Sequence, residues 1–290
     1  MDVAGAGVPP LNAPARHVDL HLHSTASDGV LPPAQVVERS AARGLVAVAL
    51  TDHDTLAGVA DAQAAGARLG VRVIGGCEFS VAAPWGEMHL LGYFLPAGSA
   101  ELEEFLVRCR TDRVRRAREM VARARGLGLP LDYDDVLREA GSAAVGRPHV
   151  ARAMVRRGAA ADVGAAFDRY LARGRPAFVE KTLPSFGEVA ELVHRLGGLV
   201  SAAHLRDRGT AAWLGRLRDE GLDAVETRHP SHDPECRARL TDVALALGLL
   251  RTGGSDWHGE DFPDRGHAAL GAQEVPAEWL DALDARGGTA

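Results

Sequence analysis

The chain has 290 residues, of which 25% are charged and 46% apolar, and its formal net charge is −6. A chain of this length can bury the core of one large domain, or of a domain with an insertion, without disulfides. The acidic balance argues against a protein that coats nucleic acid or anionic membrane through bulk charge. The longest apolar runs are far shorter than the ~20 residues that span a bilayer. The three cysteines form no CxxC pair, which is typical of a reducing compartment. We therefore expect a cytoplasmic protein that makes no membrane contact.

The first part of the chain alternates short apolar runs with amphipathic stretches. Residues 1–16 lack the basic and apolar segments of a signal peptide and are predicted to form a disordered leader. Strands are then predicted over residues 17–21, 45–50, 71–77 and 87–94, and helices over residues 33–43 and 55–69. Strands that are apolar throughout and separated by helices predict a parallel sheet covered by helices.

Residues 97–181 have a different pattern. Helices are predicted over residues 100–126, 148–157 and 162–172, followed by one strand over residues 176–179. The first helix carries eight arginines between Arg108 and Arg125, which we expect to form a solvated face. The alternation then returns, with strands over residues 198–203, 224–227 and 249–253. We predict an α/β domain formed by residues 17–96 and 182–286, interrupted by a helical insertion over residues 97–181.

Histidines and carboxylates occur where the predicted strands end. His21 and His23 are two residues apart on the first strand, so their side chains point to the same face. In a (β/α) barrel the carboxyl ends of the strands meet at one mouth. Imidazole and carboxylate groups gathered there are typical ligands of Zn, Mn or Fe. The predicted metal ligands are His21, His23, Asp28, His53, Glu78, His89, His204, Asp256 and His258.

The motifs that carry these residues resemble those of the PHP (polymerase and histidinol phosphatase) family. They are DLHLHSTASDG (19–29), TDHDT (51–55), GCEFS (76–80), HLLGY (89–93), AAH (202–204) and GSDWH (254–258). The resemblance implies a distorted (β/α)7, TIM-like barrel that holds two or three divalent metal ions. Mn, Fe, Zn and Mg are all compatible with these ligands, and manganese is favoured.

Carried over position by position, the resemblance divides the ligands among three sites. The first would be held by His21, His23, Glu78 and Asp256. The second would be held by His89 and His204, with Glu78 bridging. The third would be held by Asp28, His53 and His258.

The arginine-rich helix predicted over residues 100–126 and three further stretches resemble a bacterial branch of the family that acts on nucleotides. The three stretches are GRPHVA (146–151), FDRYLARGRPAFVEK (167–181) and HPSHDPE (229–235). This branch includes phosphatases of nucleoside 3′,5′-bisphosphates and enzymes that trim RNA 5′ ends. The resemblance implies a metal-dependent phosphoesterase that releases the 3′ phosphate of a nucleoside 3′,5′-bisphosphate. Leu205 where Pro is usual, and Arg228 where an aromatic residue is common, affect the expected substrate preference more than the chemistry.

The insertion has the features of a lid that binds phosphate. A proline in the first turn of its second helix places Arg147 beside free backbone N–H groups, where a guanidinium can bind phosphate in a bidentate manner. Lys181, the only lysine of the chain, lies where the chain re-enters the barrel. We predict that Arg147 and Lys181 bind the phosphate and assist catalysis. His149 and His232 are predicted to add substrate contacts, and His229 to act as general acid.

Three alternative functions stay open at this point. A 5′-to-3′ exoribonuclease acting on short RNA would use the same metals, with the arginine-rich helix following the RNA backbone. A phosphatase of AMP or histidinol phosphate would share the barrel, although the nucleotide-type insertion disfavours histidinol phosphate. A non-enzymatic, metal-binding regulatory module is least favoured, because no predicted ligand is missing. The expected partner is therefore a small nucleotide or a short RNA, and no obligate protein partner is predicted.

Overall fold

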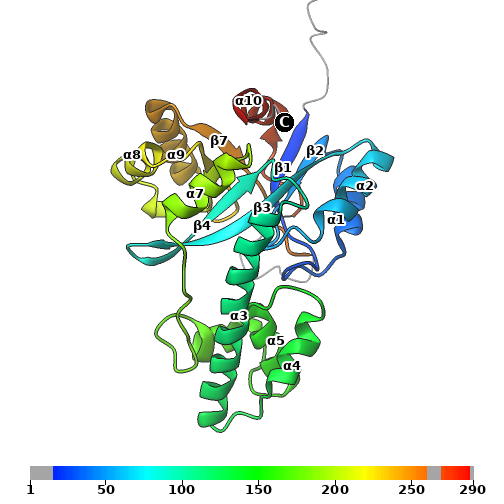
Figure 1. Ribbon diagram of the computed structural model, residues 1–290, viewed down its shortest axis with the longest axis vertical. Helices are drawn as coiled ribbons and strands as arrows, with labels where there is room; N and C mark the ends of the chain where they lie inside the picture. Colours follow the sequence, from blue (N-terminus) through cyan, green and yellow to red (C-terminus); the bar gives the residue numbers. More distant parts are fainter. Residues whose placement is uncertain (1–15, 260–268, 288–290) are drawn as a thin grey trace, which may run out of the picture.

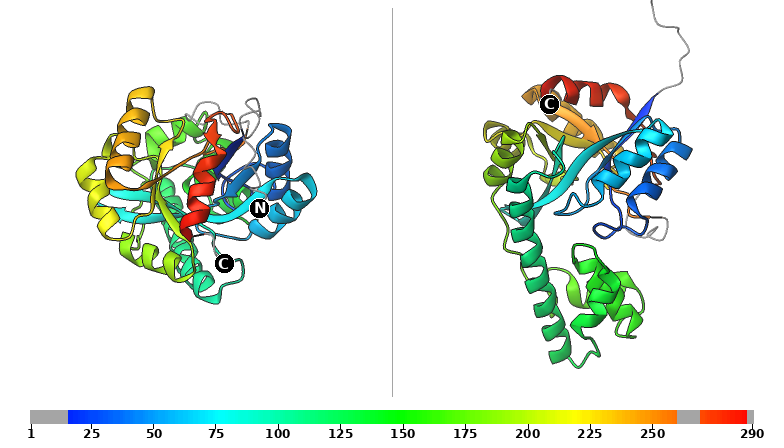
Figure 2. Two further views of the ribbon diagram at one scale, coloured as in Figure 1. Left: turned by 90° about the horizontal axis from the view of Figure 1, so that it is seen from above. Right: turned by 45° about the vertical axis from the view of Figure 1, so that its right-hand side comes forward.

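One sheet of eight strands curls into a nearly closed barrel, and a group of helices extends from one side of it (Figure 1; Figure 2). The computed structural model describes residues 16–259 and 269–287. The predicted leader lies outside these residues, except for Arg16. The strand order is β7-β6-β5-β4-β3-β2-β1-β8. The α/β barrel predicted from the sequence is confirmed.

The barrel strands are short, and most of their residues are buried, because helices cover the outer face of the sheet. The strands are β1 (His17–Leu22), β2 (Ala47–Leu50), β3 (Arg72–Ala83), β4 (Gly86–Tyr93), β5 (Leu199–Ala202), β6 (Ala224–Arg228), β7 (Leu250–Gly253) and β8 (Val275–Pro276). The covering helices are α1 (Pro33–Ala42), α2 (Val59–Leu69), α7 (Phe186–Arg195), α8 (Ala211–Asp219), α9 (Pro234–Leu247) and α10 (Ala277–Gly287). Within the described ranges, no helix is both long enough and apolar enough to cross a membrane.

The barrel closes between β1 and the segment that follows β7. Leu22 at the end of β1 forms a parallel bridge with Trp257. Asp19, which is buried in β1, accepts hydrogen bonds from the backbone N–H groups of Ser255 at 2.9 Å and Gly271 at 3.0 Å. The segment after β7 is therefore fixed against the strand that carries the first two predicted ligands.

The sheet is mixed, so the prediction of an all-parallel sheet is wrong. β4 runs antiparallel to both β3 and β5, and β8 runs antiparallel to β1. Only Pro84 and Trp85 separate β3 from β4, and a two-residue turn can join only antiparallel strands. Gly86, which follows this turn, has a φ of +116°, a conformation that favours glycine. The second half of β4, residues 90–93, is fully buried although both neighbouring strands are antiparallel to it.

The insertion lies between β4 and α7 and contains five helical segments. They are α3 (Ala100–Gly126), α4 (Tyr133–Ala140), α5 (Arg147–Arg156), α6 (Val163–Ala166) and the π-helical turn η1 (Phe167–Leu171). The first turns of α3 bury Leu102 and Leu106 in the barrel core, whereas Met120 and Val121 pack in a separate core of the insertion. One long helix therefore ties the two parts together (Figure 2).

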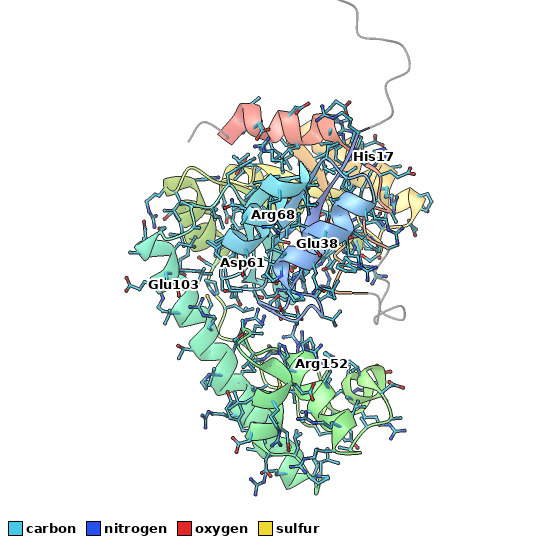
Figure 3. The ribbon with its side chains drawn as sticks, turned by 90° about the vertical axis from the view of Figure 1, so that its right-hand side faces the viewer. His17, Glu38, Asp61, Arg68, Glu103 and Arg152 are labelled. Atoms are coloured by element: carbon cyan, nitrogen blue, oxygen red, sulfur yellow. The ribbon has the colours of Figure 1, made fainter. Side chains whose placement is uncertain are left out.

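The insertion contacts the loop that follows β1. The backbone N–H of Ala144 donates to the carbonyl of Ala26 at 3.2 Å, and Arg152 donates to the carbonyl of Asp28 at 3.5 Å. Figure 3 shows Arg152 on the side of the insertion that faces the barrel. The loop with one predicted metal ligand is therefore in contact with the insertion.

Two local predictions for residues 97–181 are wrong for the same reason. No strand forms over residues 176–179, because arginines of α3 take the carbonyls that a strand would pair. Arg116 donates to Val179 O at 2.7 Å, and Arg123 donates to Phe178 O. The arginine face of α3 is correspondingly not all solvated: Arg116 and Arg113 are buried, and Arg113 donates to Asp54 Oδ2 of the barrel at 2.5 Å.

Candidate metal centre

Histidine and carboxylate side chains from six barrel strands or the loops after them meet in one cup. The cup has a volume of about 300 Å³ and is lined by His53, Glu78, His89, His204, Arg206, His229, Ser231, Asp256 and His258. His21 and His23 are fully buried beneath it. The structure therefore brings together the side chains that the sequence placed at separate strand ends.

One group of potential ligand atoms lies at the end of β1. His21, His23, Glu78 and Asp256 each offer an atom within 4.8 Å of the others. His23 Nε2 lies 3.1 Å from Glu78 Oε2 and 3.1 Å from Asp256 Oδ1. These are the four residues that the family resemblance assigns to the first site.

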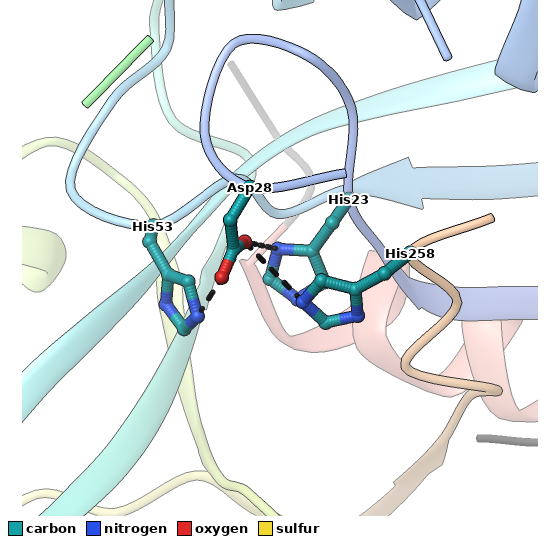
Figure 4. Close-up of side chains that lie close together, drawn as sticks. All are labelled: His23, Asp28, His53 and His258. Carbon is teal, nitrogen blue, oxygen red and sulfur yellow. Dashed lines mark ion pairs between the residues drawn. The ribbon is translucent and has the colours of Figure 1, made fainter. Parts of the chain in front are cut away.

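A second group surrounds Asp28 in the loop after β1 (Figure 4). Asp28 Oδ1 lies 3.3 Å from His258 Nε2 and 4.0 Å from both His53 Nε2 and His23 Nδ1. Asp28, His53 and His258 are the residues assigned to the third site. His23 joins this group through Nδ1, so its two ring nitrogens face two different groups.

Glu78 lies at the centre of the cup, at the point where β3 passes from β2 to β4. Its Oε1 is 2.6 Å from His89 Nδ1 and 3.1 Å from His204 Nε2, whereas its Oε2 faces His21 and His23. His53 also contacts Oε2, at 3.3 Å. One carboxylate therefore faces both the first group and the pair assigned to a second site, as a bridging ligand must.

The donor set fits divalent cations. Among the described residues, the buried nitrogens His23 Nδ1, His23 Nε2, His53 Nδ1 and His89 Nδ1 make no hydrogen bond, which is rare for buried polar atoms. Burial raises the pKa of Glu78, but the surrounding histidines, His53 first, lower it well below its ordinary range. Burial lowers the pKa of His53 to about 3. Ionised carboxylates and a neutral imidazole are the forms that bind metal.

The buried carboxylates of the cup attract positive charge. Burial lowers the pKa of His23, but Asp256 and Glu78 outweigh this effect and raise it to about 10. The same carboxylates that retain a proton on this ring would attract a metal cation, and metal binding would displace the proton.

The predicted phosphate-binding residues lie beside the cup. Lys181 Nζ donates to Ser80 Oγ at 2.6 Å and pairs with Glu87. Arg147 is the first residue of α5, and its guanidinium lies 3.9 Å from the same Glu87 carboxylate. Glu87 Oε1 also lies 3.2 Å from His89 Nε2. The two cations are therefore linked through Glu87 to a histidine that lines the cup.

The comparisons with known proteins agree with this geometry. A family model described as the PHP domain matches residues 19–232. The chain belongs to the PHP family. The family resemblance stated from the motifs is thereby confirmed.

Relatives of this PHP protein carry different names. A 5′-3′ exoribonuclease of Haemophilus influenzae is 34% identical over 245 residues, which cover 83% of this chain and 89% of the relative. A 3′,5′-nucleoside bisphosphate phosphatase of Chromobacterium violaceum is 33% identical over 261 residues, which cover 87% of this chain and 91% of the relative. A solved structure from Bifidobacterium adolescentis, provisionally named a metal-dependent phosphoesterase, matches with a TM-score of 0.86 at 32% identity. That match covers 95% of this chain and 98% of the other.

The three remaining predicted histidines occupy different positions in this PHP barrel. His229 lines the cup, with Nε2 3.4 Å from Asp256 Oδ2. His149 is buried in α5, and its Nδ1 accepts a hydrogen bond from Gly146 N–H at 2.9 Å. His232 is buried as well, and its Nε2 accepts from Arg206 N–H at 3.2 Å. Burial lowers the pKa of both His149 and His232 to about 4, so both are neutral supports of the backbone. Their contact with substrate stays a prediction.

The sequence interpretation missed Glu226, which is fully buried in β6. Its Oε1 lies 3.1 Å from His21 Nδ1, and its Oε2 accepts from His204 N–H at 2.8 Å. Together with His21 and His229 it also forms a further group of potential ligands. Carboxylates in this position commonly orient metal-binding histidines. A charged residue inside an otherwise apolar strand could have pointed to it.

Asp52, in the loop after β2, was also missed. Its Oδ2 accepts from Ser24 Oγ at 2.6 Å and its Oδ1 from Ser27 Oγ at 2.6 Å. These contacts fix the loop that carries Asp28. Asp52 stands next to His53 in a motif rich in candidate ligands, so only the structure shows that it points away from the cup.

Proposed function

We propose that this metal-dependent phosphoesterase hydrolyses the 3′ phosphate of a nucleoside 3′,5′-bisphosphate. One observation carries the proposal: the linked cations Arg147 and Lys181 lie beside the histidine–carboxylate cup, at His89. The cup suits the phosphate that is cleaved, and the cations suit a second phosphate on the same molecule. The likeness to a relative named for this activity supports the choice.

The nine predicted ligands would hold two or three divalent ions, with manganese as the favoured metal, in a cytoplasmic enzyme. When bound, these ions would supply the charge that activates a water molecule and neutralises the phosphate. The chain itself contributes orientation. Glu78 and Asp256 keep the imidazole rings of His21 and His23 in place, and the ammonium and guanidinium groups hold the second phosphate.

His229 has the geometry of a general acid in this proposal. Its Nδ1 accepts a hydrogen bond from Ser231 N–H at 3.0 Å, so the ring proton is on Nε2. That atom faces Asp256 and the cup. A proton there can pass to the oxygen that leaves the phosphorus.

We assign residues 97–181 the role of a lid over the substrate. The insertion supplies Arg147, and its contacts with Ala26 and Asp28 place it against the loop after β1. Such a segment can exclude bulk water from the cup and restrict access to short substrates.

The substrate assay compares adenosine 3′,5′-bisphosphate with AMP and 3′-AMP in the presence of Mn²⁺. A second phosphate held by one or two cations should raise kcat/KM at least about tenfold over either monophosphate. Inorganic phosphate and AMP should be the products. Equal kcat/KM for the bisphosphate and the monophosphates would refute recognition of the second phosphate.

Stepwise hydrolysis of RNA is the second candidate, favoured by the 34% identity to a protein named 5′-3′ exoribonuclease. Both activities can use the same cup, because a phosphodiester and a phosphomonoester both present non-bridging phosphate oxygens that divalent metal ions can bind. Short 5′-phosphorylated RNAs separate the candidates: release of mononucleotides at an efficiency equal to bisphosphate hydrolysis would favour the nuclease.

A further inference from the structure

The cation Arg147 lines a pocket whose aromatic end, at Trp85, has no role in the function described so far. Its volume is about 290 Å³, and it shares His89 and His204 with the metal centre. Trp85 lines it from the barrel and Phe178 from the insertion. We propose that this pocket binds the nucleobase of the substrate, with the base stacked on Trp85. The proposal rests on the nucleotide function above and extends it to recognition of the base.

The β3–β4 hairpin sets the distance between the metal centre and the pocket. His89 and Glu87 are two residues apart on β4, so they face the same side of the sheet. Trp85 lies two residues further on, in the turn. Each such step spans roughly 6.6 Å along a strand. The Trp85 wall of the pocket therefore lies one step beyond Glu87, which pairs with Lys181 and Arg147, as a base lies beyond the phosphate of its own nucleotide.

The Trp85 ring is fixed before any ligand binds. The ring Nε1 donates to the backbone carbonyl of Glu87 at 2.9 Å. The backbone carbonyl of Trp85 accepts a hydrogen bond from Arg173 of the insertion. The indole rings of Trp85 and Trp213 form a T-shaped pair, with 5.3 Å between their centroids. A ring held in this way loses little conformational entropy when a ligand stacks on it.

One face of the ring is covered by a group that a base can replace. The Arg208 guanidinium carbon lies 5.1 Å from the Trp85 ring centroid. Arg208 is exposed, and no hydrogen bond or ion pair with another described residue holds its side chain. Guanidinium groups and nucleobases are both planar and stack on aromatic faces. A base would take this position, and Arg208 would move to the base edge, where it can donate to ring nitrogens or carbonyl oxygens.

The wall of the pocket opposite Trp85 contains Phe178, which contacts a residue of the phosphate site. Phe178 is half-buried, and the Arg147 guanidinium carbon lies 5.9 Å from its ring centroid. One residue proposed to hold phosphate therefore packs against the wall that would face the base. Because stacking increases with the size of the π surface, we expect purines to be preferred over pyrimidines.

The test compares Trp85→Ala and Trp85→Phe with a matched control, Trp279→Ala. Trp279 lies on α10 beneath two arginines, Arg228 at 5.2 Å and Arg251 at 4.6 Å, so it reproduces the cation–ring contact away from the pocket. Each variant is assayed on adenosine 3′,5′-bisphosphate and on its abasic analogue, 1-deoxyribose 3,5-bisphosphate. The ratio of the two kcat/KM values measures recognition of the base.

We expect Trp85→Ala to lower this ratio at least about fivefold. Trp85→Phe, which keeps an aromatic face, should lower it less, and the control should keep the wild-type ratio. An unchanged ratio in Trp85→Ala would overturn the base site and leave the phosphatase proposal intact.

Binding of AMP provides a readout that does not depend on turnover. Stacking should quench the tryptophan fluorescence of the metal-loaded enzyme, and the quench should be lost in Trp85→Phe and kept in Trp279→Phe. If the wild type hydrolyses no nucleotide but shows this pattern of quenching, the phosphatase proposal fails and the base site stands. If AMP causes the same quench in Trp85→Phe as in the wild type, the base site is refuted.

Discussion

Lys181 provides a test of the phosphate site through its pKa. Its side chain is only 9% exposed. Burial and the nearby Arg113 lower its pKa, Glu87 raises it in part, and the result is about 8 rather than 10.5. The ammonium is therefore charged below this pH and becomes neutral as the pH rises through it. If the charged form binds phosphate, kcat/KM should fall on the alkaline side with an apparent pKa near 8.

The size of the effect follows from the contacts of the ammonium. Lys181→Met removes a charge-assisted phosphate contact worth ~1.5–3 kcal/mol, which is about 10- to 150-fold in kcat/KM. Lys181→Arg keeps the positive charge at every accessible pH. Activity near neutral pH should therefore fall much less in Lys181→Arg than in Lys181→Met, and the alkaline decline should move to higher pH.

The assay is a profile of kcat/KM against pH for the wild type and both variants, with bound metal measured by mass spectrometry in each. Arg175→Ala, which removes an exposed cation from the same segment, serves as the control and should leave the profile unchanged. Metal content should be equal in all four proteins. An alkaline limb at the same pH in Lys181→Arg and the wild type would show that another group titrates. Near-normal kcat/KM in Lys181→Met would remove Lys181 from the phosphate site.

Three further substitutions test the cup and its supports. Asp256→Ala removes a carboxylate that contacts both His21 and His23, so it should abolish turnover and lower bound metal by at least one ion per chain. Full metal occupancy would contradict the assignment. Glu226→Ala should weaken metal binding about 10- to 100-fold. Glu226→Gln can still accept a backbone hydrogen bond and should weaken metal binding less. Equal loss of metal affinity in the two variants would indicate that Glu226 acts through its charge alone. Arg113→Met leaves the buried carboxylate of Asp54 unpaired and should lower the free energy of unfolding by about 3–5 kcal/mol. Arg115→Met, at an exposed position of the same helix, is the control for Arg113→Met. Equal melting temperatures for the two variants would refute the predicted destabilisation.

The positions of the candidate ligands could be predicted because they depend on local periodicity. His21 and His23 are two residues apart at the end of β1, and most of the other ligands follow or interrupt short apolar runs typical of buried strands. Barrel geometry then brings the strand ends together. The structure adds which atoms face one another, such as the two nitrogens of His23 directed at two groups. Metal occupancy of these groups stays a prediction.

The features that could not be predicted depend on contacts between distant segments. The carbonyl groups of residues 178 and 179 are bound by arginines of α3, so a sequence typical of a strand forms none. Arg113 and Arg116 occur in a run that looks solvated, and their burial depends on a barrel carboxylate and on the returning chain. The antiparallel β4 depends on a two-residue turn, Pro84–Trp85, that lacks the Asn-Gly or Asp-Gly pattern of typical hairpins.

That unexpected hairpin is also the element that joins the parts of the proposed site. In its register Ser80 pairs with His89, and alternation places Glu78 and Glu87 on the same face. One side of one hairpin therefore carries the central carboxylate of the cup, a histidine beside it, and the groups that hold Lys181, with Trp85 in the turn. A pair of parallel strands separated by a helix could not place these groups in one continuous row. The strand pair therefore fixes the spacing of Glu78, His89 and Trp85, and the cations Arg147 and Lys181 lie against this row through their contacts with Glu87.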